Sequence, residues 1–247
     1  MNSISFLSWN LNLMENSHVA PVGWRMDQAE SLIRERVLLV DPDFVCFQEL
    51  PGLVPYVETH ELIPANTVSH CGNLATLVRR ELLDQVESRA VGRYAVLSAM
   101  ESAGVSFANV HLAPGGHGKT ERLNAIERII SICPTPNLVV IGDTNTRISE
   151  TSAIEALGVH GELPPSPTWD SRCNRFRDDG KCYTAYFTRY FHSDGVGVKD
   201  VKVFNQPWNL DGSRFFLSDH FALAGRVELP SALSRATRKG SHSTENY

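Results

Sequence analysis

The sequence predicts an α/β fold in which two β-sheets pack face to face and helices cover their outer sides. Three observations lead to this expectation. Apolar, strand-like segments outnumber helix-like ones, and strand–helix–strand order occurs in both halves of the chain. The chain has 247 residues, of which 42% are hydrophobic, enough to bury one large core. We therefore predict a single domain over residues 1–229, followed by a Ser-, Lys- and Arg-rich tail, residues 230–247, that is disordered.

The first half of the chain is predicted to contain one helix among several strands. Residues 3–11 alternate between apolar and polar side chains and predict a strand. Apolar residues at helical spacing predict a helix over residues 21–40, which Asp41 and Pro42 stop. Further strands are expected at residues 43–50, 73–83, 94–101 and 104–116, the last closed by a Pro-Gly-Gly breaker.

The second half is predicted to alternate between helices and strands before strands prevail. An apolar stripe predicts a helix over residues 119–132. The segment "NLVVIGD", residues 137–143, predicts a strand buried on both faces, with Gly142 forming the bend at its end. A short helix follows, and either Ser149 or Thr151 can cap it. The remaining strands are expected within residues 183–195, 196–205 and 215–229.

Composition and charge limit the functions that the chain can have. The formal net charge is −5, so no overall positive field attracts nucleic acid, although a phosphate-cleaving enzyme with local basic residues remains compatible. No stretch of about 18 apolar residues and no signal-peptide pattern occurs, so we expect no membrane span. Five cysteines without a pairing framework favour reduced thiols in a cytoplasmic protein. Cys173 and Cys182 could instead pair across a loop tip or bind a metal weakly.

Polar side chains of complementary chemistry stand next to the apolar segments. They are Asn10, Glu49, His111, Asp143, Asn145, Asp219 and His220. Taken one at a time, each is more simply a turn former or a hydrogen-bonded surface residue. Together they fit metal-assisted chemistry on a phosphate, because a carboxylate such as Glu49 is a hard ligand suited to Mg²⁺ or Mn²⁺. Asp143 could orient or deprotonate an attacking water, and Asn145 could hold that water or a phosphate oxygen.

Several segments, in this order, resemble motifs of the endonuclease/exonuclease/phosphatase superfamily. They are "LSWNLN", "DFVCFQEL", "NVHLAPG", "VVIGDTNTR", "PTWDS" and "FLSDHFAL". Within this superfamily they look like the deoxyribonuclease I-like metal-dependent phosphodiesterases, and among these the branch containing tyrosyl-DNA phosphodiesterase 2. The resemblance covers residues 3–229. It implies a four-layer α/β/β/α sandwich of two mostly antiparallel sheets, with the active site at one end of both sheets.

The resemblance also implies a role for each matching residue near the scissile phosphate. Glu49 would bind Mg²⁺ or Mn²⁺ directly, and Asn10 would lie beside the metal. Asp143 would position and activate the attacking water. Asn145 would bind the scissile phosphate.

Two histidines and one further carboxylate complete the implied site. His111 and His220 look like phosphate-contacting histidines, with His220 the better candidate for acid–base work. Asp219 would hold a histidine in its correct tautomer. Adjacent residues on a strand point to opposite faces, so His220 is expected to face the site while Asp219 orients a neighbouring histidine.

One position departs from the resemblance. Members close to the tyrosyl-DNA branch carry an Asp in an "F-D-R-I-F"-like strand, and Thr188 stands at that place in this chain. Thr188 cannot supply the charge of a carboxylate. The sequence leaves two outcomes open: either Asp170 or Asp194 rebuilds the contact, or a site residue is held more loosely.

Substrate contacts are expected near the segment "TWDS". Trp169 could stack on a base, although a core tryptophan is the simpler interpretation. Arg172 and Arg175 could contact substrate phosphates. With Asp178 and Asp179 close by, a solvated hairpin is the simpler interpretation of this loop.

The resulting hypothesis is a Mg²⁺- or Mn²⁺-dependent phosphodiesterase that acts on nucleic acid, DNA or RNA, or on a nucleotide-like ester. An activated water would attack the phosphorus. Alternatives remain open. A phosphatase or a lipid phosphodiesterase could use the same scaffold, since fold does not determine substrate, and a chain with Thr188 could also be a non-catalytic binding member. No protein partner is implied.

Overall fold

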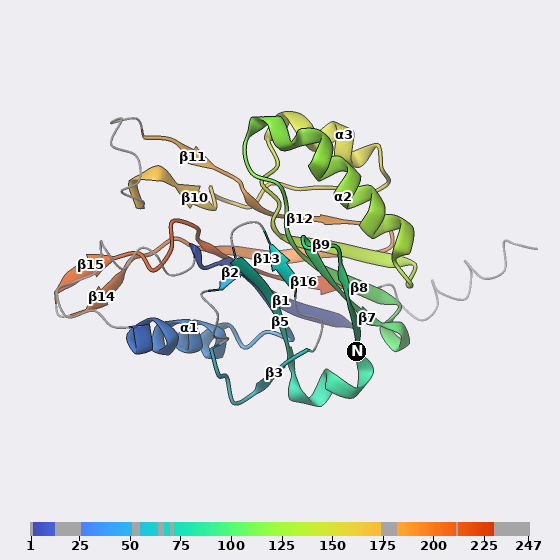
Figure 1. Cartoon of the computed structure of the whole chain (residues 1–247). Helices are drawn as coiled ribbons and strands as arrows, with labels where there is room; N and C mark the ends of the chain where they lie inside the picture. Colours follow the sequence, from blue (N-terminus) through green and yellow to red (C-terminus); the bar gives the residue numbers. More distant parts are fainter. Residues whose placement is uncertain are drawn as a thin grey trace, which may run out of the picture.

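A computed structural model describes residues 2–12, 26–50, 55–63, 67–69, 72–173, 182–210 and 212–229 (Figure 1). The predicted tail, residues 230–247, and the candidate substrate ligand Arg175 lie outside these ranges. The described residues form two large sheets that pack against each other, with helices on the outer sides.

The first sheet combines strands from both ends of the chain. In spatial order its strands are β13 (Gly197–Phe204), β16 (Ala222–Glu228), β1 (Ser3–Asn10), β2 (Phe44–Leu50), β5 (Gly72–Arg79) and β3 (His60–Leu62), and β4 (Thr67–Ser69) also pairs with β5. β1 and β2 are parallel, and the other neighbours are antiparallel. Because β1 lies between β16 and β2, the beginning of the chain and the last described strand form the middle of this sheet.

The second sheet is built from the middle of the chain. Its order is β12 (Thr188–His192), β9 (Asn137–Asp143), β8 (Val105–His111), β7 (Ala95–Met100) and β6 (Glu87–Val91). β8 and β9 are parallel and are connected through a helix, as parallel neighbours require. The other neighbours are antiparallel. Two short ribbons accompany the sheets: β10 (Trp169–Asp170) with β11 (Thr184–Ala185), and β14 (Trp208–Leu210) with β15 (Ser213–Phe215).

Three apolar clusters define four layers. Between the sheets, Phe44 and Phe107 stack with their ring centroids 4.6 Å apart. Helix α1 (Met26–Val40) packs Ile33 and Val37 against the outer face of the first sheet. Helices α2 (Lys119–Ile132) and α3 (Thr151–Glu155) pack on the outer face of the second sheet, for example through Ile126. The layer order is helix, sheet, sheet, helix, which confirms the predicted four-layer sandwich with mostly antiparallel sheets.

Most strand and helix positions follow the sequence pattern, and the differences occur in short or polar segments. α2 and β9 have the predicted bounds. The strand expected over residues 73–83 ends at Arg79, where the chain turns into a 3-10 helix. Short 3-10 helices are found at Arg80–Gln85, Glu101–Ala103, Gly116–Gly118, Ile148–Glu150 and Ser171–Cys173. β3, β4, β6 and the β14–β15 ribbon were not expected, because strands that are short, or largely exposed like β6, depend on their partners rather than on their own sequence.

Two further expectations concern membranes and cysteines. Within the described ranges, none of the helices combines the length and the apolar character needed to cross a lipid bilayer. Cys173 and Cys182 are both described and both are free thiols, so the disulfide that the sequence left open is not formed.

Candidate active site

Strand ends from both sheets meet at one end of the sandwich. β1 and β2 run in parallel and carry Asn10 and Glu49 near their ends, and β8 and β9 run in parallel and end at His111 and Asp143. β16 and β12 are antiparallel to these strands, so their first residues lie at the same edge. The topology therefore gathers side chains from distant parts of the sequence at one place.

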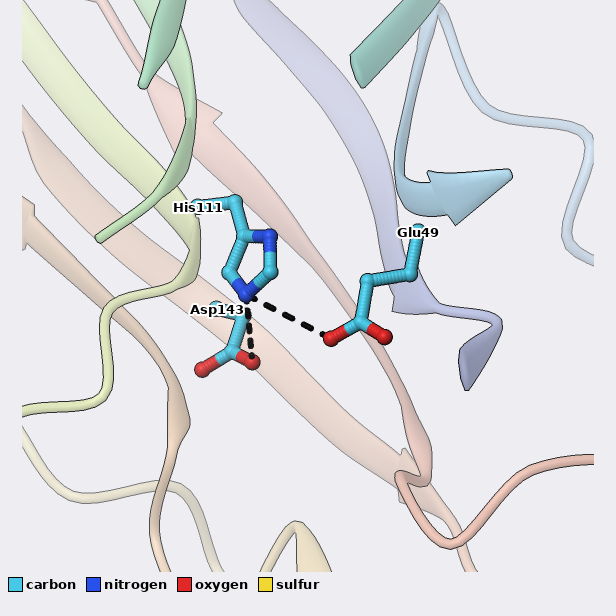
Figure 2. Close-up of side chains that lie close together, drawn as sticks. All are labelled: Glu49, His111 and Asp143. Atoms are coloured by element: carbon cyan, nitrogen blue, oxygen red, sulfur yellow. Dashed lines mark ion pairs between the residues drawn. The ribbon is translucent and has the colours of Figure 1, made fainter. Parts of the chain in front are cut away.

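Glu49, His111 and Asp143 form the centre of the site (Figure 2). Nε2 of His111 lies 3.4 Å from Oε1 of Glu49 and 3.6 Å from Oδ2 of Asp143. One ligand atom from each of the three residues lies within 4.8 Å of the others. The side chains of His111 and Asp143 are buried, and that of Glu49 is 13% exposed. Charged groups this close and this well shielded from water are unfavourable unless a partner compensates them.

Asn10 holds the two carboxylates together. Its Nδ2 donates to Oε1 of Glu49 and to Oδ2 of Asp143, both at 2.8 Å. Its Oδ1 accepts the backbone N–H of Asn12 at 2.8 Å, and this contact determines which end of the amide faces the carboxylates. Asn10 therefore presents a donor to the site, and its place beside a metal stays a prediction.

Glu49 is held in an uncommon backbone conformation. Its φ is 53°, and the pairing of β2 with β5 shifts register between Phe47 and Leu50, which marks a bulge. Such bulges and left-handed residues often re-aim a side chain at functional sites. The pKa of the Glu49 carboxyl is raised to about 7, chiefly by burial and also by the charge of Asp143, against the hydrogen bond from Asn10. A carboxylate in this state gains strongly from a nearby cation.

The donor set fits a hard divalent cation. Within the described residues, the ion pairs of Glu49 and Asp143 involve histidines and neither lysine nor arginine. Among the residues with a described structure, the two carboxylates therefore lack a permanently positive partner. Carboxylate oxygens are the preferred ligands of Mg²⁺ and Mn²⁺. Glu49 and Asp143 would hold such an ion, with His111 as a third donor.

The turn after β9 is fixed by contacts on two sides. The backbone N–H of Asn145 donates to Oδ1 of Asp143 at 3.1 Å, and Asn145 has a φ of 50°. Nδ2 of Asn145 donates to the carbonyl of Leu112 at 3.1 Å. The hydroxyl of Thr144 donates to the carbonyl of Phe187 at 3.0 Å. These contacts keep Asp143 and Asn145 in one orientation, as a preorganised site requires.

Gly142 does not form the bend that the sequence suggested. β9 continues through Asp143, and Gly142 lies within the strand opposite Val110 of β8. A Cβ atom at Gly142 would lie 2.1 Å from the carbonyl oxygen of Val110, and the φ of Gly142 is 143°. Glycine is required here because the two strands approach too closely for a side chain. This close approach brings His111 and Asp143 side by side, as paired residues of β8 and β9.

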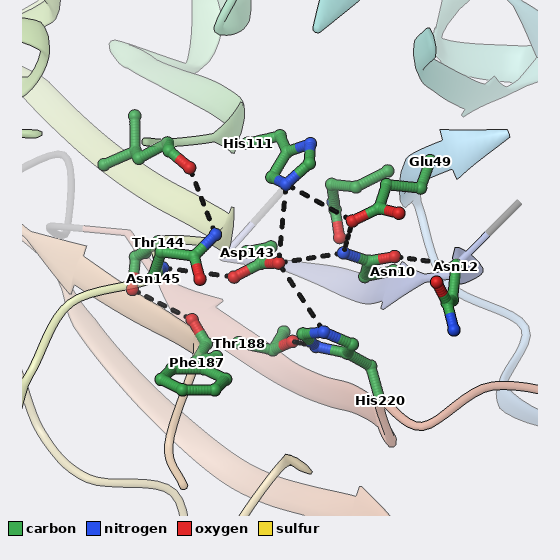
Figure 3. A network of polar contacts seen from close by, with 12 residues as sticks. Asn10, Asn12, Glu49, His111, Asp143, Thr144, Asn145, Phe187, Thr188 and His220 are labelled. Atoms are coloured by element: carbon green, nitrogen blue, oxygen red, sulfur yellow. Dashed lines mark hydrogen bonds and ion pairs between the residues drawn. The ribbon is translucent and has the colours of Figure 1, made fainter. Parts of the chain in front are cut away.

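His220, in the bend before β16, lies on another side of Asp143 (Figure 3). Its Nε2 lies 3.7 Å from Oδ2 of Asp143, and its Nδ1 lies 3.4 Å from Oγ1 of Thr188. Its carbonyl accepts the indole N–H of Trp9 at 3.0 Å, and its backbone N–H donates to Oγ of Ser218 at 3.1 Å. Both the backbone and the ring of His220 are therefore held, with the ring facing Asp143.

Asp219 and Trp169 form a buried pair next to the site. Nε1 of Trp169 donates to Oδ2 of Asp219 at 2.7 Å. Trp169 is 8% exposed, and its ring lies 4.8 Å from that of Tyr183 and 5.6 Å from that of Phe187. This packing suits a core tryptophan. Base stacking by Trp169 and the orienting role of Asp219 stay predictions.

Arg172 is paired with a carboxylate of its own segment. Its Nε donates to both carboxylate oxygens of Asp170, at 2.9 and 3.0 Å. The hydrogen bond from Arg172 lowers the pKa of Asp170. The side chain of Arg172 is 65% exposed, so it remains accessible to a ligand, and its contact with substrate stays a prediction.

Arg147 lies next to Asn145, although the sequence did not single it out as a candidate site residue. Its Nη1 donates to the carbonyl of Asn145 at 3.1 Å, and its guanidinium lies 4.6 Å from the ring centroid of Phe187. A cavity of about 390 Å³ lies here and is lined also by Tyr183 and Tyr186. The sequence could have indicated Arg147, because a basic residue stands two positions after Asn145. It could not have indicated the two tyrosines, because they come from a segment far along the chain.

A buried ion pair ties two loops of the site to α2. Arg122 is fully buried and donates to both carboxylate oxygens of Glu150, at 2.6 and 3.0 Å, and to the carbonyl of Ala113 at 2.6 Å. Ala113 lies in the loop after His111, and Glu150 lies in the 3-10 helix that follows Asn145. Arg122 therefore links the two loops that leave the site.

Comparison with known proteins gives matches among solved structures only. No protein-family model and no curated protein matches the sequence. The crystal structure of D. rerio TDP2 complexed with a single-strand DNA product is 17% identical over 92% of this chain and 99% of that chain, with a TM-score of 0.68. An endonuclease/exonuclease/phosphatase family protein from Bacteroides thetaiotaomicron is 16% identical over 93% and 98%, with a TM-score of 0.67. A mannosyl-6-phosphatase from the same organism is 15% identical over 91% and 99%, also with a TM-score of 0.67.

Proposed function

We propose that this chain, which has the endonuclease/exonuclease/phosphatase fold, hydrolyses a phosphodiester in a nucleic acid or a nucleotide-like ester with the help of Mg²⁺ or Mn²⁺. The observation that carries the proposal is the convergence of Glu49, His111, Asp143 and His220 on one shielded place. They come from separate segments. In the part of the chain that the structure describes, the ion pairs of the two carboxylates are with imidazoles, and a buried group of this kind suits a site that binds a divalent cation.

The contacts of each side chain indicate its role in the proposed reaction. Mg²⁺ or Mn²⁺, when bound by Glu49 and Asp143, supplies positive charge that offsets the negative charge developing on the phosphoryl oxygens. The carboxylate of Asp143 is oriented at Oδ1 by the N–H of Asn145 and at Oδ2 by Asn10. It is therefore fixed in place to orient an attacking water and to accept its proton. His220 offers Nε2 to a phosphoryl oxygen from the other side of Asp143.

Asn145 and Arg147 suit the scissile phosphate and the group attached to it. Within the described ranges, the amide of Asn145 uses one N–H for the carbonyl of Leu112, which leaves the second for a phosphate oxygen. Arg147 adds a positive charge at the cavity lined by Tyr183 and Phe187. Arginine and aromatic rings are the groups on which nucleotide bases stack. This chemistry favours a nucleic-acid or nucleotide ester.

The similar structures support this choice and one alternative. D. rerio TDP2 is complexed with a single-strand DNA product. One of the two similar Bacteroides thetaiotaomicron proteins is a mannosyl-6-phosphatase. A phosphatase is therefore the second candidate, because a phosphomonoester needs the same charge stabilisation on the same scaffold.

The test is hydrolysis of a substrate panel with Mg²⁺, with Mn²⁺ and with EDTA. The panel contains single-stranded DNA, RNA, cyclic dinucleotides, 5′-tyrosyl DNA ends, sugar phosphates and phospholipid head groups. We expect metal-dependent hydrolysis of a nucleic-acid or nucleotide substrate. Glu49→Gln and His220→Gln should lower kcat/KM by about 100-fold or more, since each removes a group at the reacting phosphate.

The matched control is Glu101→Gln. Glu101 is exposed in the 3-10 helix between β7 and β8, at the end of these strands opposite to His111. This variant should hydrolyse at the wild-type rate. A folded wild-type protein that cleaves nothing on the panel with either metal contradicts the proposal, and binding without turnover would then indicate a binding member. A preference for sugar phosphates or for head groups would identify a phosphatase or a lipid phosphodiesterase instead.

A further inference from the structure

Thr188 lies next to Nδ1 of the His220 ring, at the position where the sequence has no carboxylate (Figure 3). It is fully buried and is the first residue of β12, directly opposite Asp143 in β9. Side chains of directly paired residues point to the same face of a sheet, so Thr188 and Asp143 lie on one side. The imidazole is contacted at Nδ1 by Oγ1 of Thr188, at 3.4 Å, and at Nε2 by Oδ2 of Asp143, at 3.7 Å.

The carboxylates that could rebuild this contact are engaged elsewhere. Asp170 is paired with Arg172, and Asp194 is paired with His160. Within the described residues, the partner of Nδ1 of His220 is therefore a neutral hydroxyl.

A hydroxyl and a carboxylate favour different tautomers of a neutral imidazole. A carboxylate only accepts hydrogen bonds, so it draws the proton to the ring nitrogen that it faces. A hydroxyl can also donate, and it then faces an unprotonated nitrogen. At the other end of the His220 ring, an unprotonated Nε2 would be repelled by the carboxylate oxygen of Asp143. The arrangement of the two partners therefore favours a proton on Nε2.

We propose that Thr188 is a positioning residue whose hydroxyl donates to Nδ1 of His220 and so orients the ring with a protonated Nε2 toward the site. The catalytic meaning of this contact rests on the proposed function. In this tautomer Nε2 donates a hydrogen bond to a phosphoryl oxygen and has no free lone pair to take up a proton. In this arrangement His220 is a hydrogen-bond donor at the reacting phosphate and does not take the proton of the attacking water.

Long-range ¹H–¹⁵N NMR of the imidazole rings tests the tautomer without any substrate. The measurement uses metal-free, ¹⁵N-labelled full-length protein at alkaline pH, where imidazoles are neutral. The His220 signals are assigned by their loss in His220→Gln. Wild type and Thr188→Ser should show a protonated Nε2 and an unprotonated Nδ1. Thr188→Val, which keeps the shape but lacks the hydroxyl, should keep a protonated Nε2 because Asp143 still faces it, and Thr188→Asp should move the proton to Nδ1.

Kinetics with the substrate found by the panel measures the consequence. Thr188→Val should lower kcat about tenfold with KM within about twofold, because the ring loses its orientation while the binding groups remain. Thr188→Ser should restore kcat to near the wild-type value, and thermal unfolding checks that each variant is folded. A proton on Nδ1 in the wild type, a wild-type tautomer in Thr188→Asp, or a wild-type kcat in Thr188→Val would overturn the inference. If no substrate is hydrolysed, the proposed function fails while the NMR result still decides the role of Thr188.

Discussion

Glu49 keeps its carboxyl in a shielded position next to a second carboxylate, and this arrangement opposes folding of the metal-free protein at neutral pH. Its pKa is raised from 4.5 to about 7, chiefly by burial. The folded state therefore binds this proton more tightly than the unfolded state does. Linkage requires such a group to stabilise the fold at low pH, and this contribution is lost as the pH rises from 4.5 to about 7.

We expect the pH dependence of stability to change in Glu49→Gln, which cannot ionise. In EDTA, the free energy of unfolding of the wild type should fall between about pH 5 and about pH 8 by roughly 2 to 3 kcal/mol more than that of Glu49→Gln. Urea denaturation at both pH values measures this difference. Glu101→Gln, which removes an exposed carboxylate, should keep the wild-type slope. An equal pH dependence of the free energy of unfolding in the wild type and Glu49→Gln would show that folding does not raise the pKa of the Glu49 carboxyl.

At the scale of elements, the β8–β9 pair is the part of the sandwich on which the site depends most. It places His111 beside Asp143, and the distance between the two strands is set by Gly142 opposite Val110. The clash of a side chain here would involve backbone atoms of β8, which have little freedom to move inside a sheet. Glycine is therefore required at position 142 by the pairing of β8 with β9 and not by a turn.

Replacement of Gly142 by alanine should destabilise the protein much more than replacement of a glycine that only has a positive φ. Gly158 is the matched control, since its φ is 91° and nothing lies within 4 Å of the place that a Cβ atom would take there. We expect Gly158→Ala to cost about 1 kcal/mol and Gly142→Ala to cost about 3 kcal/mol or more. Urea denaturation measures both. If Gly142→Ala does not fold while Gly158→Ala does, the conclusion is the same. Equal costs for the two variants would mean that the strand spacing is not what requires glycine at position 142.

At the scale of the whole molecule, the site joins the two sheets. Glu49 belongs to the first sheet, whereas His111 and Asp143 belong to the second. Between the sheets, Nε2 of Gln48 also donates to Oδ1 of Asn109 at 2.8 Å. A cation bound by residues of both sheets therefore stabilises their packing and not only a local loop.

Addition of Mg²⁺ or Mn²⁺ should raise the thermal unfolding temperature of the wild-type protein. At a free metal concentration about 100 times Kd, the stabilisation is about 2.7 kcal/mol, which corresponds to roughly 5 to 10 °C for a chain of this size. Glu49→Gln and Asp143→Asn should lose most of this shift, and Glu101→Gln should keep it. Differential scanning calorimetry with increasing metal measures the effect. The same shift in all variants would place the cation elsewhere.

The sequence by itself determined the features that depend on neighbouring residues. The apolar period and the flanking breakers were sufficient for α2 and β9, and the ordered motifs were sufficient for the endonuclease/exonuclease/phosphatase fold, which the structure bears out. The types of the site residues were also readable, because a carboxylate, an amide or an imidazole at a strand end is visible in any sequence. Arg175 and the tail, residues 230–247, lie outside the described residues, and those predictions stay open.

Only the tertiary structure decided how these residues meet. The amide of Asn10 turns its nitrogen to the carboxylates because the backbone of Asn12 occupies its oxygen, and Thr188 reaches His220 because β12 pairs with β9 in one register. The raised pKa of Glu49 exists only once the chain has excluded water from around it. Sequence patterns report interactions over a few residues, whereas these contacts depend on register and burial between segments that folding brings together.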